Sequence, residues 1–206
     1  MKRLLMLFCF FFATGASATA APAPDELVRA VTNEVLEIVR TDKALQAGDP
    51  ERVLELVHEK VLPHFDFRRM TMLAVGRDWR NATPEQQDRL VDAFLNLLVR
   101  TYSNALTQYR DQTIDFRPLR MAAGETRVQV RTEVRQPGGQ PVGVDYMLEQ
   151  KADGSWKVFD VIVAGVSLVT NYRSSFAEEV RVGGVDGLIR SLEDKNRSLA
   201  AGQAQS

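Results

Sequence analysis

The sequence contains one cysteine, Cys9, and two histidines, His58 and His64, among 206 residues. Cys9 lies inside an apolar N-terminal segment, so the chain beyond that segment can form no disulfide and no cysteine-based metal site. The two histidines do not share one helical face, because their spacing differs from the helical repeat and Pro63 lies between them. Neither a zinc site nor a thiol nucleophile is therefore indicated, and no metal or cofactor is expected.

An excess of positive charge is also lacking. The chain carries 26 Lys and Arg against 27 Asp and Glu, a net charge of −1. A nucleic-acid-binding protein needs a basic surface, so we expect no nucleic-acid partner. The short motifs of hydrolases, zinc proteases, P-loop proteins and dinucleotide-binding enzymes are missing as well.

The N-terminus has the layout of a secretory signal peptide. Lys2 and Arg3 precede an apolar stretch over residues 4–13, and Ala18-Thr19-Ala20 offers a small-residue cleavage site. The stretch is shorter than the ~20 residues of a membrane-spanning helix, and charges interrupt every later apolar run. We therefore expect residues 1–20 to be a cleaved signal peptide and the mature chain to be exported and soluble.

Apolar periodicity and capping signals predict helices in the N-terminal half. Asp49-Pro50 joins an N-cap residue to a proline at the first helical position. Thr83 and Gln86 have the spacing of a capping box. The predicted helices cover about 25–41, 50–62, 67–75 and 84–109.

The period then changes to two, which indicates strands. Val128, Val130, Thr132 and Val134 alternate with polar side chains, as in a half-buried antiparallel strand. Glycine-containing turns separate the strands and favour hairpins. The predicted strands cover about 113–121, 127–135, 142–148 and 156–163.

Two further helices are expected at the C-terminus, over about 167–182 and 185–195, with Gly183-Gly184 between them. The tail from Ser198 is expected to be disordered. Helices, then strands, then helices predict an α+β single domain. Its N-terminal and C-terminal helices pack on a curved antiparallel sheet of about four strands.

Asp160 is the acid that stands out, because it lies within the apolar stretch 156–163. A buried carboxylate of this kind can be a catalytic base, as in cone-shaped isomerases. The alternative is a structural acid that pairs with an arginine or caps a backbone group. We favour the structural interpretation, since no second acid or tyrosine partner is evident.

A basic cluster lies over the third predicted helix and the loop after it. It either contacts a lipid phosphate or an acidic partner, or it forms an ordinary solvated face that aspartates interrupt. Its members are Arg68, Arg69, Arg77 and Arg80.

Two segments resemble the MlaC family of toluene-tolerance proteins. The first has Leu62-Pro63, an aromatic residue, a helix that ends at Gly76, then Trp79 and Ala82-Thr83-Pro84 before a long helix. The second runs from Trp156 to Leu188 and includes the strand Trp156-Lys157-Val158-Phe159-Asp160-Val161, then Gly165-Val166-Ser167 and Gly184-Val185-Asp186-Gly187-Leu188. The resemblance covers nearly the whole chain.

The resemblance implies a cone-like fold (NTF2-like or cystatin-like) with a hydrophobic cavity, and a periplasmic carrier that is not an enzyme. Such a carrier holds a glycerophospholipid with its acyl tails inside and exchanges it between the inner and outer membranes, which maintains outer-membrane lipid asymmetry. The partners implied are an inner-membrane ABC transporter, reached through its MCE-domain ring, and an outer-membrane lipoprotein–porin complex. A monomer is expected, with a lipid-binding domain over residues 21–197 and a disordered tail over 198–206.

The apolar faces of the helices, and the alternation of apolar and polar side chains along the strands, then predict which residues line the lipid cavity. The predicted lipid-binding residues are Met70, Leu73, Leu98, Tyr102, Leu106, Phe116, Val128, Val130, Val144, Tyr146, Leu148, Val163, Val166 and Val169. Two alternatives stay open at this point: an isomerase-like or hydrolase-like enzyme on a similar fold, and a docking protein with a solid core.

Overall fold

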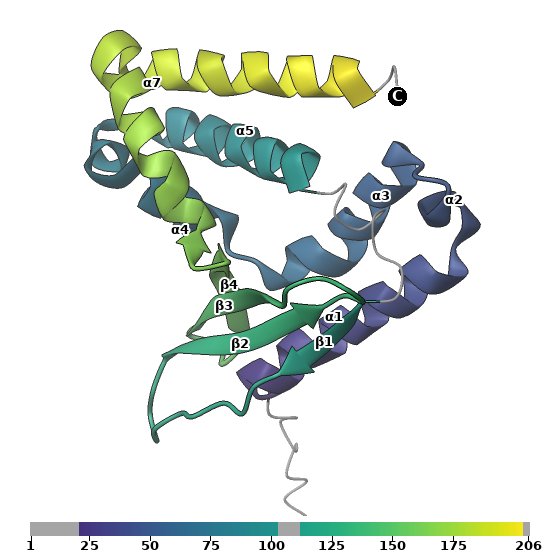
Figure 1. The fold of residues 1–206 in the computed structure, drawn as a ribbon. Helices are drawn as coiled ribbons and strands as arrows, with labels where there is room; N and C mark the ends of the chain where they lie inside the picture. Colours follow the sequence, from purple (N-terminus) through teal and green to yellow (C-terminus); the bar gives the residue numbers. More distant parts are fainter. Residues whose placement is uncertain (1–20, 103–111, 204–206) are drawn as a thin grey trace, which may run out of the picture.

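The computed structural model describes residues 21–102 and 112–203 (Figure 1). The predicted signal peptide, the end of the fourth predicted helix and Leu106 lie outside the described residues. Within the described part, no helix is both long and apolar enough to cross a membrane. The chain order is helices, then a sheet, then a long bent helix, as the sequence predicts for an α+β protein.

Helices form the N-terminal half of the described chain, and those that follow Asp49 and Thr83 begin at the predicted cap residues. The helices are α1 (Pro24–Thr41), α2 (Lys43–Gln46), α3 (Pro50–Leu56), α4 (Phe67–Val75) and α5 (Pro84–Tyr102). The Asp49 carboxylate accepts hydrogen bonds from the backbone N–H groups of Glu51 and Arg52 at 3.0 and 3.2 Å. Thr83 and Gln86 form the reciprocal capping box at 3.0 and 3.2 Å.

Short irregular turns connect these helices. After α3 the chain forms a π-helical turn, η1 (Val57–Val61), and a 3₁₀ turn, η2 (Leu62–His64). A second 3₁₀ segment, η3 (Gly76–Asn81), lies between α4 and α5. Gly76 has φ 69° and ψ −132°, a backbone conformation open to glycine, and this explains why α4 ends there.

The sheet is a meander in which every strand pairs antiparallel with its neighbours in sequence. Its strands are β1 (Thr113–Phe116), β2 (Arg127–Arg135), β3 (Val142–Gln150), β4 (Trp156–Val163) and β5 (Val166–Ser167). Five strands are present where about four were predicted. The additional strand β5 forms because Ala164 and Gly165, both at positive φ, turn the chain back onto β4.

Several element boundaries differ from the predictions. Strand β1 ends at Phe116 instead of reaching residue 121, and Pro118, which has no N–H to donate, follows shortly after. The C-terminal helix α7 (Leu168–Gln203) begins after β5 and bends at Gly184, which has φ 65°. The segment from Ser198 to Gln203, predicted to be disordered, continues this helix because Leu199 packs on the helical core.

Three hydrophobic clusters hold the elements together. The helical cluster joins α4, η3, α5 and α7 around Phe94, Phe176 and Leu90. The sheet cluster joins the beginning of α1 to β2, β3 and β4, and a third cluster joins α1, α2 and α3. Figure 1 shows the resulting layers: α4, α5 and α7 lie together above the sheet, and α1 lies along it.

Candidate functional site

One face of the sheet is apolar along nearly its whole length. The strand register places Val128 opposite Leu148 and Val130 opposite Tyr146. The apolar rows continue across β4, where Tyr146 faces Val161 and Val144 faces Val163. A β-bulge between Met147 and Leu148 shifts the register by one residue, and this keeps the valines of β4 on the same face.

At one end this face is covered. Val28 of α1 packs against Val128, Val130, Leu148 and the β4 residues Trp156 and Val158. These side chains are 6% exposed or less. Arg29 lies over the ring of Phe116 at 4.1 Å and extends the cover toward β1. This end of the face is therefore an ordinary packed core.

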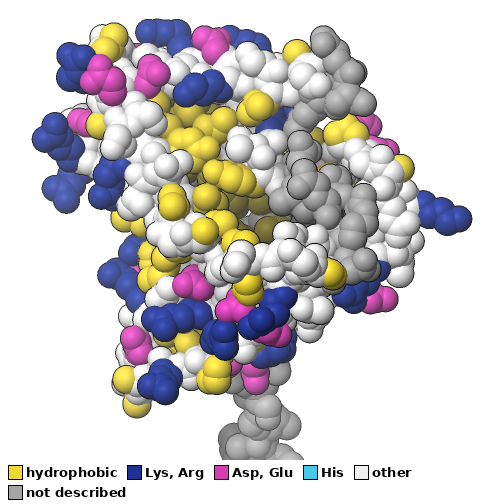
Figure 2. Space-filling view, viewed as in Figure 1, with side chains coloured by type: hydrophobic (Ala, Val, Ile, Leu, Met, Phe, Trp, Pro, Cys, Tyr) yellow, Lys and Arg dark blue, Asp and Glu magenta, His cyan; other side chains and the backbone are white. Residues whose placement is uncertain are grey.

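At the other end the same face is open. Val142, Val163 and Val166 are 38%, 37% and 55% exposed, and Val144 between them is half-buried. Figure 2 shows hydrophobic side chains gathered in a hollow between the helical layer and the sheet, with charged side chains on either side. The open end offers β-branched side chains to an apolar partner molecule without first requiring the core to unpack.

Tyr146 lies where the covered and open ends meet. Burial raises the pKa of its phenol, and a hydrogen bond with the side chain of Thr32 acts in the opposite direction. The hydroxyl group therefore stays neutral at physiological pH and ties β3 to α1. Tyr146 marks the inner limit of the open apolar surface.

The structure places most of the predicted wall residues on two layers. Met70, Leu73, Leu98 and Val169 belong to or pack on the helical cluster. Phe116, Val128, Val130, Tyr146 and Leu148 belong to or pack on the sheet cluster. Val144, Val163 and Val166 form the open end, Tyr102 is 40% exposed at the end of α5, and Leu106 lies outside the described residues.

Several of these side chains are enclosed by protein atoms. Met70 and Val130 are 1% exposed, Leu148 is 0% and Val169 is 2% exposed. A side chain that faced a water-sized space would keep more accessible surface, so these four contribute packing in this structure. They would touch a ligand only after neighbouring side chains move.

Phe65 is a candidate site residue that the sequence reasoning missed. It packs against both the helical cluster and the sheet cluster, and it stacks on Phe67 at 5.6 Å. Its backbone also forms a bridge with Val158. The sequence places Phe65 before a helix cap, as in a hydrophobic staple, and this signal gives no indication of contact with the sheet.

Asp160 serves as a structural acid. Its carboxylate is 9% exposed and accepts hydrogen bonds from the Ser167 hydroxyl at 2.5 Å and the Val169 N–H at 3.1 Å. The carboxylate thus caps the first turn of α7. Both of its oxygens are engaged in this cap, which matches the structural interpretation.

The four arginines of the predicted basic cluster do not form one site. Arg68 pairs with Asp88 at 2.6 Å on the surface, whereas Arg69 pairs with Glu149 at 3.0 Å and lies over the ring of Phe159. Arg77 and Arg80 are exposed on η3 and border a separate groove of 720 Å³. Arg69 is therefore a link between α4 and the sheet.

Neither histidine belongs to a metal site in the described part of the chain, which contains no group of three His, Cys, Asp or Glu residues suited to a metal ion. Burial, together with the nearby Lys157 ammonium, lowers the pKa of His64. His64 is thus neutral at pH 7, which suits its position in η2.

Comparison with known proteins agrees with this geometry. The family model described as MlaC protein matches residues 29–194. Two curated relatives are the toluene tolerance protein ttg2D of Pseudomonas putida and the intermembrane phospholipid transport system binding protein MlaC of Haemophilus influenzae. The first is 30% identical over 81% of this chain and 77% of its own length, and the second is 22% identical over 88% and 86%.

A solved structure is also similar. The phospholipid-binding protein from Ralstonia solanacearum, in complex with a phospholipid, is 39% identical and has a TM-score of 0.81. The match covers 87% of this chain and 99% of that chain.

Proposed function

Because the chain belongs to the MlaC family, we propose that it is a phospholipid-binding transport protein that carries a glycerophospholipid between membranes. The observation that supports this most directly is the open apolar end of the sheet, where Val142, Val163 and Val166 are exposed. The phospholipid bound to the 39%-identical Ralstonia protein supports the same assignment.

The physical task of such a carrier is desolvation. A two-chain phospholipid has about 30 methylene groups, and at ~0.8 kcal/mol each its tails resist transfer into water by roughly 24 kcal/mol. Free diffusion through an aqueous compartment is therefore far too rare. A carrier must only match the bilayer, so aliphatic walls without catalytic groups are sufficient.

The proposed route for the tails starts at the open end of the sheet and passes between the sheet and the helical layer. Val144, Val163 and Val166 would meet the lipid first, and Tyr146 would lie deeper. Enclosed side chains such as Met70 and Leu148 would complete the wall once the layers separate around the tails. The phosphate should remain in water at the mouth, because burying an unpaired charge is costly.

The wall proposed for the lipid is the complete set predicted from the sequence, together with Phe65. Phe65 joins this set because it touches both the helical and the sheet cluster.

The cellular setting is part of the proposal. Residues 1–20 would be a cleaved signal peptide and the carrier would work in the periplasm. There it would meet an MCE-domain ring at the inner membrane and a lipoprotein–porin complex at the outer membrane, and so maintain outer-membrane asymmetry. Relatives named for an intermembrane phospholipid transport system and for toluene tolerance support this setting. We favour a carrier over an enzyme, since Asp160 is used as a helix cap.

Native mass spectrometry of the freshly purified mature protein tests the proposal. We expect a co-purified phospholipid in the wild type, and a loss of most of it in Val144→Trp and Val163→Trp. Val182→Trp is the matched control, because Val182 is 74% exposed on α7 and belongs to none of the three hydrophobic clusters. Wild-type protein without lipid after expression and after incubation with phospholipid vesicles would contradict the proposed function.

A further inference from the structure

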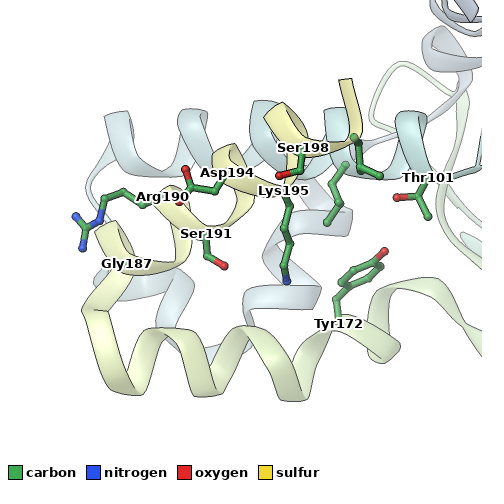
Figure 3. Close-up of a pocket in the computed structure, with 10 residues that line it drawn as sticks. Thr101, Tyr172, Gly187, Arg190, Ser191, Asp194, Lys195 and Ser198 are labelled. Carbon is green, nitrogen blue, oxygen red and sulfur yellow. The ribbon is translucent and has the colours of Figure 1, made fainter. Parts of the chain in front are cut away.

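The bend of α7 at Gly184 leaves a groove between α7 and α5, away from the sheet. The two arms of α7 and the helix α5 line this open, wedge-shaped groove, which has a volume of 790 Å³ (Figure 3). This volume lies within the ~300–1,000 Å³ range of small-molecule sites. None of the residues that line the wedge belongs to the wall proposed for the cargo lipid.

The C-terminal arm of α7 contributes a polar row to the wedge. Ser191, Lys195 and Ser198 follow one another at spacings of four and three residues, so they share one helical face. Figure 3 shows Ser191 and Lys195 directed into the gap between the two arms. The row presents an ammonium group with a hydroxyl group on each side.

The Lys195 ammonium has no carboxylate partner among the ion pairs of residues 21–102 and 112–203. The neighbouring acid of the wedge, Asp194, is paired with Arg197. Arg190 also lines the wedge. The net charge of the side chains that line the wedge is therefore positive. An unpaired cation beside hydroxyl donors is suited to an anion that can accept several hydrogen bonds.

The remaining walls are apolar. Leu97 of α5, 5% exposed, and the half-buried Leu199 of α7 line the same space, and the ring of Tyr172 projects into it from the other arm. Burial, together with the hydrogen-bonded Tyr102, raises the pKa of Tyr172 to about 12. Its phenol therefore stays neutral and does not repel an anion.

We propose that this wedge binds an anionic single-chain amphiphile, with the headgroup on Lys195 and Ser191 and the alkyl chain against Leu97 and Leu199. A small ion would fill only part of 790 Å³ and would leave the apolar walls wet. Lys195 is exposed and water solvates its ammonium in the free protein, so an uncharged chain would gain no interaction from it. The proposal does not depend on the cargo lipid.

The test uses octyl phosphate below its micelle-forming concentration and the mature protein with its native cargo. Binding is followed by NMR shifts of the backbone amides. We expect saturable shifts at Ser191 and Lys195, and an affinity about 10-fold or more lower in Lys195→Gln. Lys43→Gln is the control, since Lys43 is an exposed lysine on α2.

Two further ligands separate the contributions of headgroup and chain. Inorganic phosphate and octanol should each bind at least about 10-fold more weakly than octyl phosphate. Equal affinity for inorganic phosphate would reduce the wedge to a simple anion site, and equal affinity for octanol would remove the role of Lys195. Either result overturns the proposal.

The cargo site is tested separately with Val144→Trp. This variant should lose the cargo lipid and keep wild-type affinity for octyl phosphate. Loss of both would mean that octyl phosphate was binding at the cargo site, and the wedge proposal would then be wrong. Unchanged affinity in Lys195→Gln would overturn it as well.

Discussion

The carboxylate of Asp160 accepts a hydrogen bond from the hydroxyl group of Ser167 over 2.5 Å, and this contact joins strand β4 to the start of helix α7. The second oxygen accepts from the Val169 N–H, so the buried acid is satisfied on both sides. The chain between them turns through Ala164, which has φ 50°, a conformation rare for residues other than glycine. The acid thus holds a strained turn and a helix in one position.

Replacing Asp160 should therefore destabilise the fold. We expect Asp160→Ala to lower the free energy of unfolding by about 1–3 kcal/mol, because the Ser167 hydroxyl and the Val169 N–H lose their acceptor. Ser167→Ala, which removes one of the two bonds, should cost about 1 kcal/mol. Urea denaturation followed by circular dichroism measures both. An unfolding midpoint for Asp160→Ala equal to the wild type would contradict the capping role.

Asp66 should make stability depend on acid pH. Burial acts to raise the pKa of this carboxyl, but the hydrogen bonds from the Lys151 ammonium and the Arg69 N–H outweigh burial and hold its pKa below the usual value. A carboxyl with a lower pKa in the folded state stabilises the protein above its unfolded pKa of about 3.9. This stabilisation should be lost as pH falls through the folded pKa.

Urea unfolding between pH 7 and pH 3 checks this dependence. Asp66→Asn should be less stable than the wild type at pH 7, and the difference should shrink as the pH falls below about 4. Asp88→Asn is the matched control, because Asp88 is 69% exposed and pairs with Arg68 on the surface. A constant difference at every pH would show that Asp66 acts through packing and not through its charge.

The two adjacent glycines of α7 should respond differently to alanine. Gly184 has φ 65°, and Gly184→Ala should cost about 1–2 kcal/mol because an L-residue is strained there. Gly183 has ordinary backbone angles and open space around its Cα, so Gly183→Ala should be neutral or stabilise by up to about 1 kcal/mol. Thermal unfolding of the two variants gives the comparison. Equal effects would mean that the bend does not require glycine.

A charge at the open end of the sheet should weaken lipid binding without harming the fold. Val166 is 55% exposed, so Val166→Asp should change stability by no more than about 0.5 kcal/mol. A carboxylate at the entrance would lose hydrating water when acyl chains pack against it, which is costly. Phospholipid occupancy should therefore fall. Val182→Asp on the exposed side of α7 should keep wild-type occupancy. Thin-layer chromatography of the extracted lipid measures the phospholipid occupancy of the wild type and of the two variants.

Local signals in the sequence were sufficient for most elements of the fold. Helix starts at Asp49 and Thr83 could be predicted because capping depends on side chains within three residues of the cap. The apolar face of β2 could be predicted because alternation fixes which side chains share a face. The strand β5 was missed, since it depends on a two-residue turn with positive φ at Ala164, which is not a turn-forming residue.

The candidate site was harder to predict than the fold. Periodicity identified Val130 and Val144 as members of the same face, but it could not show that one is 1% exposed and the other half-buried. That difference depends on how much of the sheet α1 covers. This cover is a contact between residues far apart in the sequence. The wedge was missed for a similar reason, because it depends on how α5 lies against both arms of α7.

The sequential strand order has a kinetic consequence. Each of the strands β1 to β5 pairs with its neighbour along the chain, so the sheet forms through short loops such as 136–141 and 151–155. Short loops cost little closure entropy, and proteins rich in local contacts fold quickly. The sheet can therefore assemble by successive hairpins. The slow step should be docking of α1 on β2, because the two elements are far apart along the chain.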